Sequence, residues 1–90
     1  MLDIVLSNQF KKDLKSAQKR GYDLALLSAV VDKLARCETL EARYRDHNLT
    51  GKYAGFRECH VQPDWLLVYR IDEKEIILFL SRTGTHSDLF

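Results

Sequence analysis

The sequence predicts an α+β fold in which a helical hairpin packs on one face of a small antiparallel sheet, in the order β-α-α-β-β-β. Three observations lead to this prediction. Two stretches near the N-terminus carry apolar residues at helical spacing, three strand-like apolar stretches fill the second half, and short turn-rich segments separate them. With 90 residues and an apolar fraction of 46%, the chain can build one modest core. Residues 1–90 are therefore expected to form a single domain.

The N-terminal half begins with a strand-like run at residues 2–6, followed by Ser7, a residue type that often caps helices. Apolar residues then recur at helical spacing as far as Gly21, which is expected to end the first helix. A second apolar stripe starts at about Asp23. Because so few residues separate the two stripes, an antiparallel pair of helices is expected.

Three strands are expected in the second half, at roughly residues 53–61, 64–71 and 76–82. The polar run at 72–75 indicates a tight turn, so the last two strands should form an antiparallel hairpin. Residues 39–51 show no periodicity and are expected to connect the helices to the sheet.

Composition excludes some classes of protein. No apolar stretch approaches the roughly 20 residues that span a bilayer, and the start lacks the features of a signal peptide, so a cytoplasmic location without membrane contact is expected. Cys37 and Cys59 should then be reduced. Cys59 and His60 are neighbours on a predicted strand and should point to opposite faces, and no Cys-x-x-Cys pair exists. Neither a metal site nor a cofactor is expected.

The net charge is only +1, but basic residues gather at Lys11–Arg20 and again between Arg43 and Arg57. Such clusters can follow a phosphate backbone, and Lys52 and Arg57 are candidates for RNA contact. Solvated faces balanced by acidic residues, with Arg57 as a cross-strand ion-pair partner, explain the same pattern.

All three histidines, His47, His60 and His86, lie in turn-rich segments beside predicted strands. Imidazole titrates near neutrality, so these residues together with Asp64 and Arg82 could transfer protons on a phosphodiester. The alternative is that each histidine is a surface or hydrogen-bonded structural residue. Clustering requires a strand register that brings the turn at 62–63 and the end of the last strand to one edge of the sheet.

Two aromatic residues are also ambiguous. On composition alone Trp65 is expected in the core, since tryptophan is the largest apolar side chain that a small core can bury. Phe90 either packs back on the domain or presents its ring to a base.

Three motifs taken together carry a resemblance to a known family: Tyr44-Arg-Asp-His47-x-Leu-x-Gly51, Phe56-Arg-x-x-His60-Val-x-Pro-Asp64-Trp65-x-Leu-Val-Tyr69 and Arg82-Thr-Gly-Thr-His86-x-x-Leu-Phe90. The chain resembles the YafQ branch of the RelE/ParE toxin superfamily, and the likeness extends over nearly its whole length. The resemblance implies a RelE-like fold and the toxin of a type II toxin–antitoxin pair. It further implies a ribosome-dependent, metal-independent endoribonuclease that cuts mRNA in the A site by attack of the 2′-OH.

Carried over by motif, the implied catalytic residues are His47, His60, Asp64, Arg82 and His86. In this scheme His86 is the general acid and His60 or His47 the base, although the acid and base roles could be exchanged. Asp64 would orient the base, and Arg82 would balance charge on the phosphorane. Trp65 and Phe90 would stack on the splayed nucleotide.

The implied partners are the ribosome, mRNA and an acidic DinJ/RelB-like antitoxin, in a hetero-oligomer that can bind operator DNA through the antitoxin. Two alternatives stay open at this point: a ParE-like toxin that binds DNA gyrase, and a non-catalytic interaction module. Neither needs the histidine set.

Overall fold

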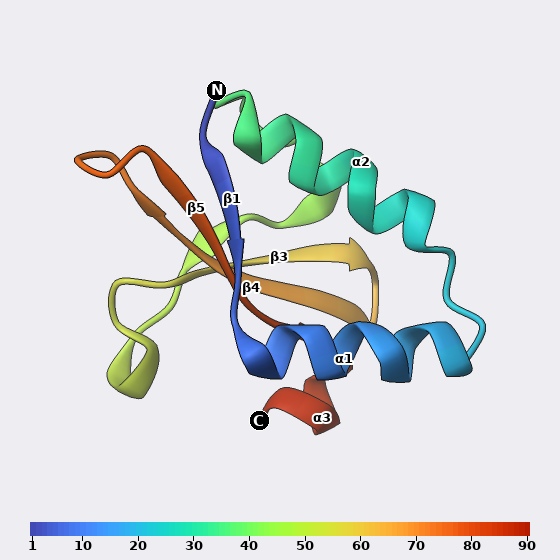
Figure 1. Cartoon of the computed structure of the whole chain (residues 1–90). Coiled ribbons are helices and arrows are strands. Elements are labelled where there is room, and N and C mark those ends of the chain that lie inside the picture. Colours follow the sequence, from blue (N-terminus) through green and yellow to red (C-terminus); the bar gives the residue numbers. More distant parts are fainter.

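The computed structural model describes all 90 residues and shows a five-stranded sheet in the order β1-β5-β4-β3-β2 with three α-helices (Figure 1). The elements are β1 (Asp3–Leu6), α1 (Asn8–Lys19), α2 (Leu24–Ala35), β2 (His47–Asn48), β3 (Arg57–Gln62), β4 (Trp65–Asp72), β5 (Ile77–Gly84) and α3 (His86–Leu89), with 3-10 turns η1 (Ala42–Tyr44) and η2 (Gly51–Tyr53). The predicted α+β class is confirmed. None of the helices has the length and apolar character needed to cross a membrane.

Both long helices begin where the sequence predicted, and each start is capped by a side chain. The Ser7 Oγ accepts a hydrogen bond from the Phe10 amide at 2.9 Å, and the Asp23 carboxylate accepts one from the Ala25 amide at 3.0 Å. Between the helices Gly21 has φ +79°, a conformation in which other side chains are strained. Local sequence signals therefore set the start of both helices and the end of α1.

The sheet differs from the expectation in one strand. Neighbouring strands from β2 to β5 are antiparallel, as predicted, but β1 pairs with β5 in parallel, so the sheet is mixed. Tight turns force the strands that they join to run antiparallel. Because β1 reaches β5 only after the two helices and three strands, no turn fixes its direction.

Several short elements were not predicted, and one strand begins later than expected. The strand expected from residue 53 starts at Arg57, because η2 and the turn at Gly55 (φ +92°) precede it. The connecting segment contributes β2, which pairs with β3. After the sheet, Thr85 and Asp88 form a reciprocal capping box that starts α3.

The sheet has a helix-covered face and an opposite face beneath α3. Phe10 of α1 and Leu27 of α2 pack with Trp65 and Leu67 in the main core. Figure 1 shows that α1 and α2 diverge from the turn that joins them. Between them lies an apolar groove of about 380 Å³, lined by Ile4, Leu6, Phe10, Leu14, Leu24, Leu27, Val31 and Leu80 among others.

A bulge in β5 decides which face carries Arg82. Tyr69 pairs with Leu80, but the preceding Val68 pairs with Arg82, so Ser81 is an extra residue in β5. The Ser81 carbonyl accepts a hydrogen bond of 2.7 Å from the Ser7 hydroxyl. Since side chains alternate along a strand, the extra residue moves Arg82 from the helix-covered face to the face of Val68.

Candidate functional site

The strand register places three of the sequence-predicted residues, His47, His60 and Arg82, on one face of the sheet. One cross-strand row contains His47, Glu58, Val68 and Arg82, on β2, β3, β4 and β5 respectively. With strands about 4.8 Å apart, this row spans roughly 14 Å. The next row towards α3 contains His60, Leu66 and Gly84.

This register brings the turn at 62–63 and the end of the last strand together, as clustering of the predicted residues requires. Because Leu66 lies opposite Gly84, the turn before β4 and the start of α3 share one end of the sheet.

His47 and His60 both face the carboxylate of Glu58. From Glu58 Oε1 the distance is 3.5 Å to His47 Nε2 and 3.9 Å to His60 Nε2. The two imidazole rings have centroids 6.5 Å apart. The His60 side chain is 20% exposed and that of His47 is 48% exposed, so both rings border the solvent.

Backbone carbonyls fix the orientation of both rings. His47 Nδ1 lies 2.6 Å from the Arg45 oxygen, and His60 Nδ1 lies 3.1 Å from the Pro63 oxygen. A carbonyl oxygen only accepts, so each Nδ1 carries a proton and donates. Each Nε2 is therefore the position that takes up or releases a proton, which is what an acid or a base at this site requires.

Glu58 is a site residue that the sequence analysis missed. Its side chain is 8% exposed, and Oε2 is buried with no hydrogen-bond partner in the chain. A buried carboxylate oxygen without a partner calls for an explanation, and a role beside the two imidazoles supplies one. The available signal was its spacing, since residues 58 and 60 of a strand point to the same face.

Asp64 occupies a different place from the one expected. Its carboxylate accepts a hydrogen bond from the His86 backbone amide at 3.4 Å and has no hydrogen bond to an imidazole. The carboxylate that faces the histidines is Glu58, whereas Asp64 connects the β3–β4 turn to the start of α3.

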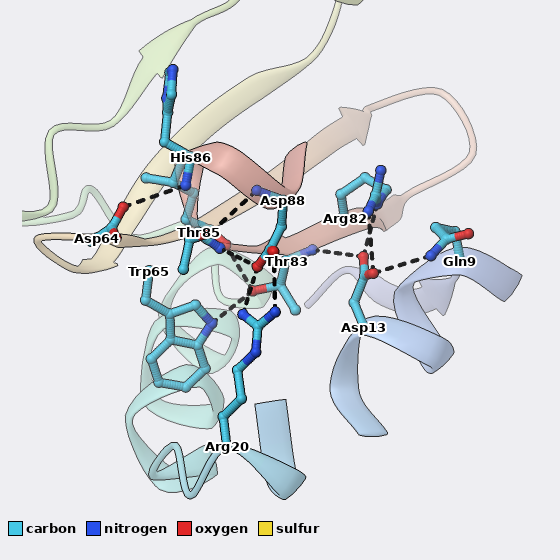
Figure 2. Close-up of polar contacts among 11 residues, drawn as sticks. Gln9, Asp13, Arg20, Asp64, Trp65, Arg82, Thr83, Thr85, His86 and Asp88 are labelled. Atoms are coloured by element: carbon cyan, nitrogen blue, oxygen red, sulfur yellow. Dashed lines mark hydrogen bonds and ion pairs between the residues drawn. The ribbon is translucent and has the colours of Figure 1, made fainter. Parts of the chain in front are cut away.

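His86 is exposed on the first turn of α3, and its ring lies 5.3 Å from that of Phe90. The imidazole has no hydrogen bond to the rest of the chain and points away from the polar network below it (Figure 2). It is free to meet a substrate oxygen.

Arg82 is held by Asp13 of α1. Its Nε and Nη2 donate hydrogen bonds of 2.8 and 3.3 Å to the Asp13 carboxylate, which raises the pKa of the guanidinium (Figure 2). Asp13 also accepts from the Thr83 amide at 3.1 Å. No hydrogen bond uses Arg82 Nη1, which leaves that nitrogen for a phosphate oxygen.

The expected stacking role of Trp65 is not supported. The residue is 2% exposed, and its ring packs 4.9 Å from that of Tyr22 within the core. Phe90 is 52% exposed, and the Tyr53 ring contacts it edge-on at 5.3 Å. The accessible aromatic surface of the site is therefore formed by Phe90 and Tyr53, not by Trp65.

Of the two basic candidates for RNA contact, one is free and the other is engaged in contacts within the chain. Lys52 is exposed on η2, and no ion pair occupies it. Arg57 instead bonds Asp46, Asn48 and the Tyr69 hydroxyl, with distances of 3.1, 2.6 and 3.3 Å. These contacts attach β2 to the sheet, as the cross-strand interpretation predicted. The Arg57 side chain lies on the face of the sheet opposite the histidines, since side chains alternate along a strand.

No group of three or more His, Cys, Asp or Glu side chains is arranged to hold a metal ion. The chemistry that this arrangement can perform with its own groups is proton transfer by imidazole near a guanidinium.

The sequence has clear relatives among known proteins. The sequence matches the family described as bacterial toxin of type II toxin-antitoxin system, YafQ, over residues 2–90. The mRNA interferase toxin YafQ of Escherichia coli K12 is 44% identical over 89 residues, which cover 98% of this chain and 95% of the relative.

Solved structures are similar in fold as well as in sequence. A metal-bound toxin from Helicobacter pylori is 52% identical, with a TM-score of 0.95 and full coverage of both chains. The YafQ toxin in the E. coli DinJ-YafQ toxin-antitoxin complex is 43% identical, with a TM-score of 0.89 over 99% of this chain and 97% of that one. The chain belongs to the YafQ family of bacterial type II toxins.

Proposed function

We propose that residues 1–90 act as a single toxin domain that cleaves mRNA in the ribosomal A site and so arrests translation in the cytoplasm. The observation that carries the proposal is the convergence of His47 and His60 on Glu58, on the same face that carries Arg82 and lies beneath His86. Curated relatives bear the name mRNA interferase toxin.

The proposed reaction is an internal transesterification. The 2′-oxygen attacks phosphorus as its proton passes to Nε2 of His60 or His47. The bond from phosphorus to the 5′-oxygen breaks, and His86 donates a proton to that oxygen. The products are a 2′,3′-cyclic phosphate and a 5′-hydroxyl, and the acid and base roles could be exchanged.

Other groups support the charge and geometry of this step. Nη1 of Arg82 would bind a non-bridging oxygen as negative charge develops on phosphorus. Glu58 would stabilise the imidazolium that forms when the base takes its proton. Phe90 and Tyr53 would hold an unstacked base, and Lys52 a neighbouring phosphate.

We also propose that an acidic antitoxin silences the toxin by occupying the apolar groove between α1 and α2. Lys11, Lys12 and Lys15 are exposed on α1 and have no ion-pair partner. A segment that folds on contact could bury apolar side chains in the groove while its carboxylates meet these lysines. A relative is known in complex with the DinJ antitoxin.

The decisive experiment incubates the purified protein with translating ribosomes and maps cut sites by primer extension. We expect cuts at A-site codons from the parent protein and none from His86→Ala at equal soluble concentration. Gyrase poisoning without RNA cleavage would indicate the ParE-like alternative, and neither effect would indicate an interaction module.

A further inference from the structure

An ion pair outside the histidine cluster connects the end of α1 with α3. Arg20 follows the last residue of α1, and Asp88 lies in α3. We propose that the Arg20–Asp88 ion pair is a positioning element for catalysis, which holds α3 in place and with it His86 and Phe90. The inference rests on the proposed function, and it assigns a role to residues that do not touch the RNA.

The carboxylate of Asp88 joins three donors (Figure 2). Arg20 donates two hydrogen bonds to it, from Nη1 at 2.6 Å and from Nη2 at 3.0 Å, and the Thr85 amide donates a third at 2.9 Å. The paired fork of a guanidinium on a carboxylate fixes direction as well as distance. The same group that closes the capping box of α3 is therefore bound to the end of α1.

The helix α3 has few other attachments. It is four residues long, far shorter than a helix that is stable alone in water. Leu89 is its one buried residue, and the contact from Asp64 to the His86 amide is long at 3.4 Å. Since His86 and Phe90 are both exposed, their positions depend on how firmly the backbone of α3 is held.

Gly84 shows how closely the carboxylate fits. A Cβ atom at this position would lie 2.9 Å from Asp88 Oδ2 and 3.1 Å from Asp88 Cβ. Any side chain at residue 84 would push the carboxylate away from Arg20. Gly84→Ala therefore provides a second way to disturb the pair without changing a charge, although it also strains the backbone, because Gly84 has φ +157°.

The experiment compares Arg20→Gln, Asp88→Asn and Gly84→Ala in single-turnover cleavage of ribosome-bound mRNA. We expect each to cleave roughly twofold to fivefold more slowly than the parent, the upper part of the range by which a partly exposed ion pair can shift a local equilibrium. Hydrogen exchange at the Leu89 and Phe90 amides should accelerate in the same variants. Arg20→Lys, which keeps the charge and one hydrogen bond, should retain most of the rate.

The two charge changes separate positioning from simple RNA attraction. Arg20→Gln removes a positive charge and Asp88→Asn a negative one, so electrostatic attraction predicts opposite effects, whereas positioning predicts the same loss. Arg36→Gln is the matched control, because Arg36 pairs with Asp32 and Glu38 on the surface of α2, at 3.3 and 2.8 Å. It should cleave at the parent rate.

Unchanged amide exchange in Arg20→Gln, or parent-level cleavage by Asp88→Asn, would overturn the proposal. His86→Ala in the same assay separates the proposed catalytic role of His86 from the positioning role of the Arg20–Asp88 pair. If His86→Ala cleaves like the parent, the proposed role of His86 fails, while amide exchange still reports whether the ion pair holds α3.

Discussion

The indole Nε1 of Trp65 donates a hydrogen bond of 2.9 Å to the hydroxyl of Thr83, and through it the first residue of β4 is attached to the end of β5. The hydroxyl in turn donates to the Leu66 carbonyl at 2.7 Å. Both side chains are 2% exposed. The residues that follow Thr83 lead directly into α3, so the core beneath the site also fixes where α3 starts.

Trp65→Phe should therefore destabilise the fold by about 1–2 kcal/mol, because it removes a buried hydrogen bond and leaves a small cavity. Thermal denaturation should show a melting temperature lower by roughly 4–8 °C per kcal/mol. A double-mutant cycle with Thr83→Val should show strong coupling between the two residues. Since Trp65 is the only tryptophan, its fluorescence provides an independent check: quenching by bound RNA would restore the stacking interpretation.

Asp13→Asn should lower the free energy of unfolding by about 1–3 kcal/mol, because the buried Asp13 carboxylate serves both Arg82 and the Thr83 amide. Asp32→Asn is the control: Asp32 pairs with Arg36 at 3.3 Å on an exposed surface, where such a pair contributes little. Urea denaturation of both variants checks the difference. Equal effects would show that Asp13 is not an anchor for β5.

Glu58→Gln keeps the size of the side chain and removes its charge. We expect single-turnover cleavage to slow by about tenfold or more, since the imidazolium formed in the reaction loses its nearest carboxylate. If Glu58 acts through His60, then Glu58→Gln should cost little in a His60→Ala background, because residues that act as a unit are not additive. Additive losses in the double variant would separate the two residues.

The sequence predicted the elements that local signals determine, and it failed where pairing over distance decides. The cap at Ser7, the helix start near Asp23 and the turn at residues 72–75 were all found. In that turn Asp72 Oδ1 accepts hydrogen bonds from the amides of residues 74 and 75. The bulge at Ser81 has no local signal, because it arises from the pairing of β5 with β4 and its contact with Ser7.

In the site, too, local signals could be found in the sequence and long-range pairing could not. Histidines in turns could be recognised as candidates from sequence, but their carboxylate partner depends on the register of β2 with β3, which places His47 opposite Glu58. Trp65 stands in a motif beside Asp64, yet alternation along β4 turns its ring into the core. By contrast, α3 could have been found, since Thr85 and Asp88 have the spacing of a capping box.

The two cysteines should differ sharply in reactivity. Burial raises the pKa of the Cys59 thiol to about 12, so the folded protein has almost no thiolate there at pH 8, whereas Cys37 is exposed. A chromogenic disulfide reagent should modify one thiol per chain before unfolding and two after it, and Cys37→Ser should remove the early reaction. Fast modification of both thiols in the native protein would contradict the buried placement of Cys59.

The same thiol affects stability in alkali. The unfolded chain ionises Cys59 near its ordinary pKa of about 8.5, while the folded chain does so only near 12. The contribution is therefore complete below about pH 8.5 and is lost as the pH rises towards 12. Cys59→Ala should flatten the decline in unfolding free energy over this range, apart from the constant cost of its cavity.

Charge reversal on α1 tests the antitoxin surface. Lys11, Lys12 and Lys15 are exposed and unpaired beside the apolar groove, so converting all three to Glu should slow association with the cognate antitoxin and weaken its dependence on salt. Dissociation should change less, because apolar contacts in the groove set the lifetime of the complex. Stopped-flow mixing at several ionic strengths measures association, and displacement by excess competing toxin measures dissociation. Each single reversal at residues 11, 12 and 15 is compared with Lys74→Glu, a single reversal in the β4–β5 turn far along the chain from α1. Association kinetics equal to those of the parent would place the antitoxin on another surface.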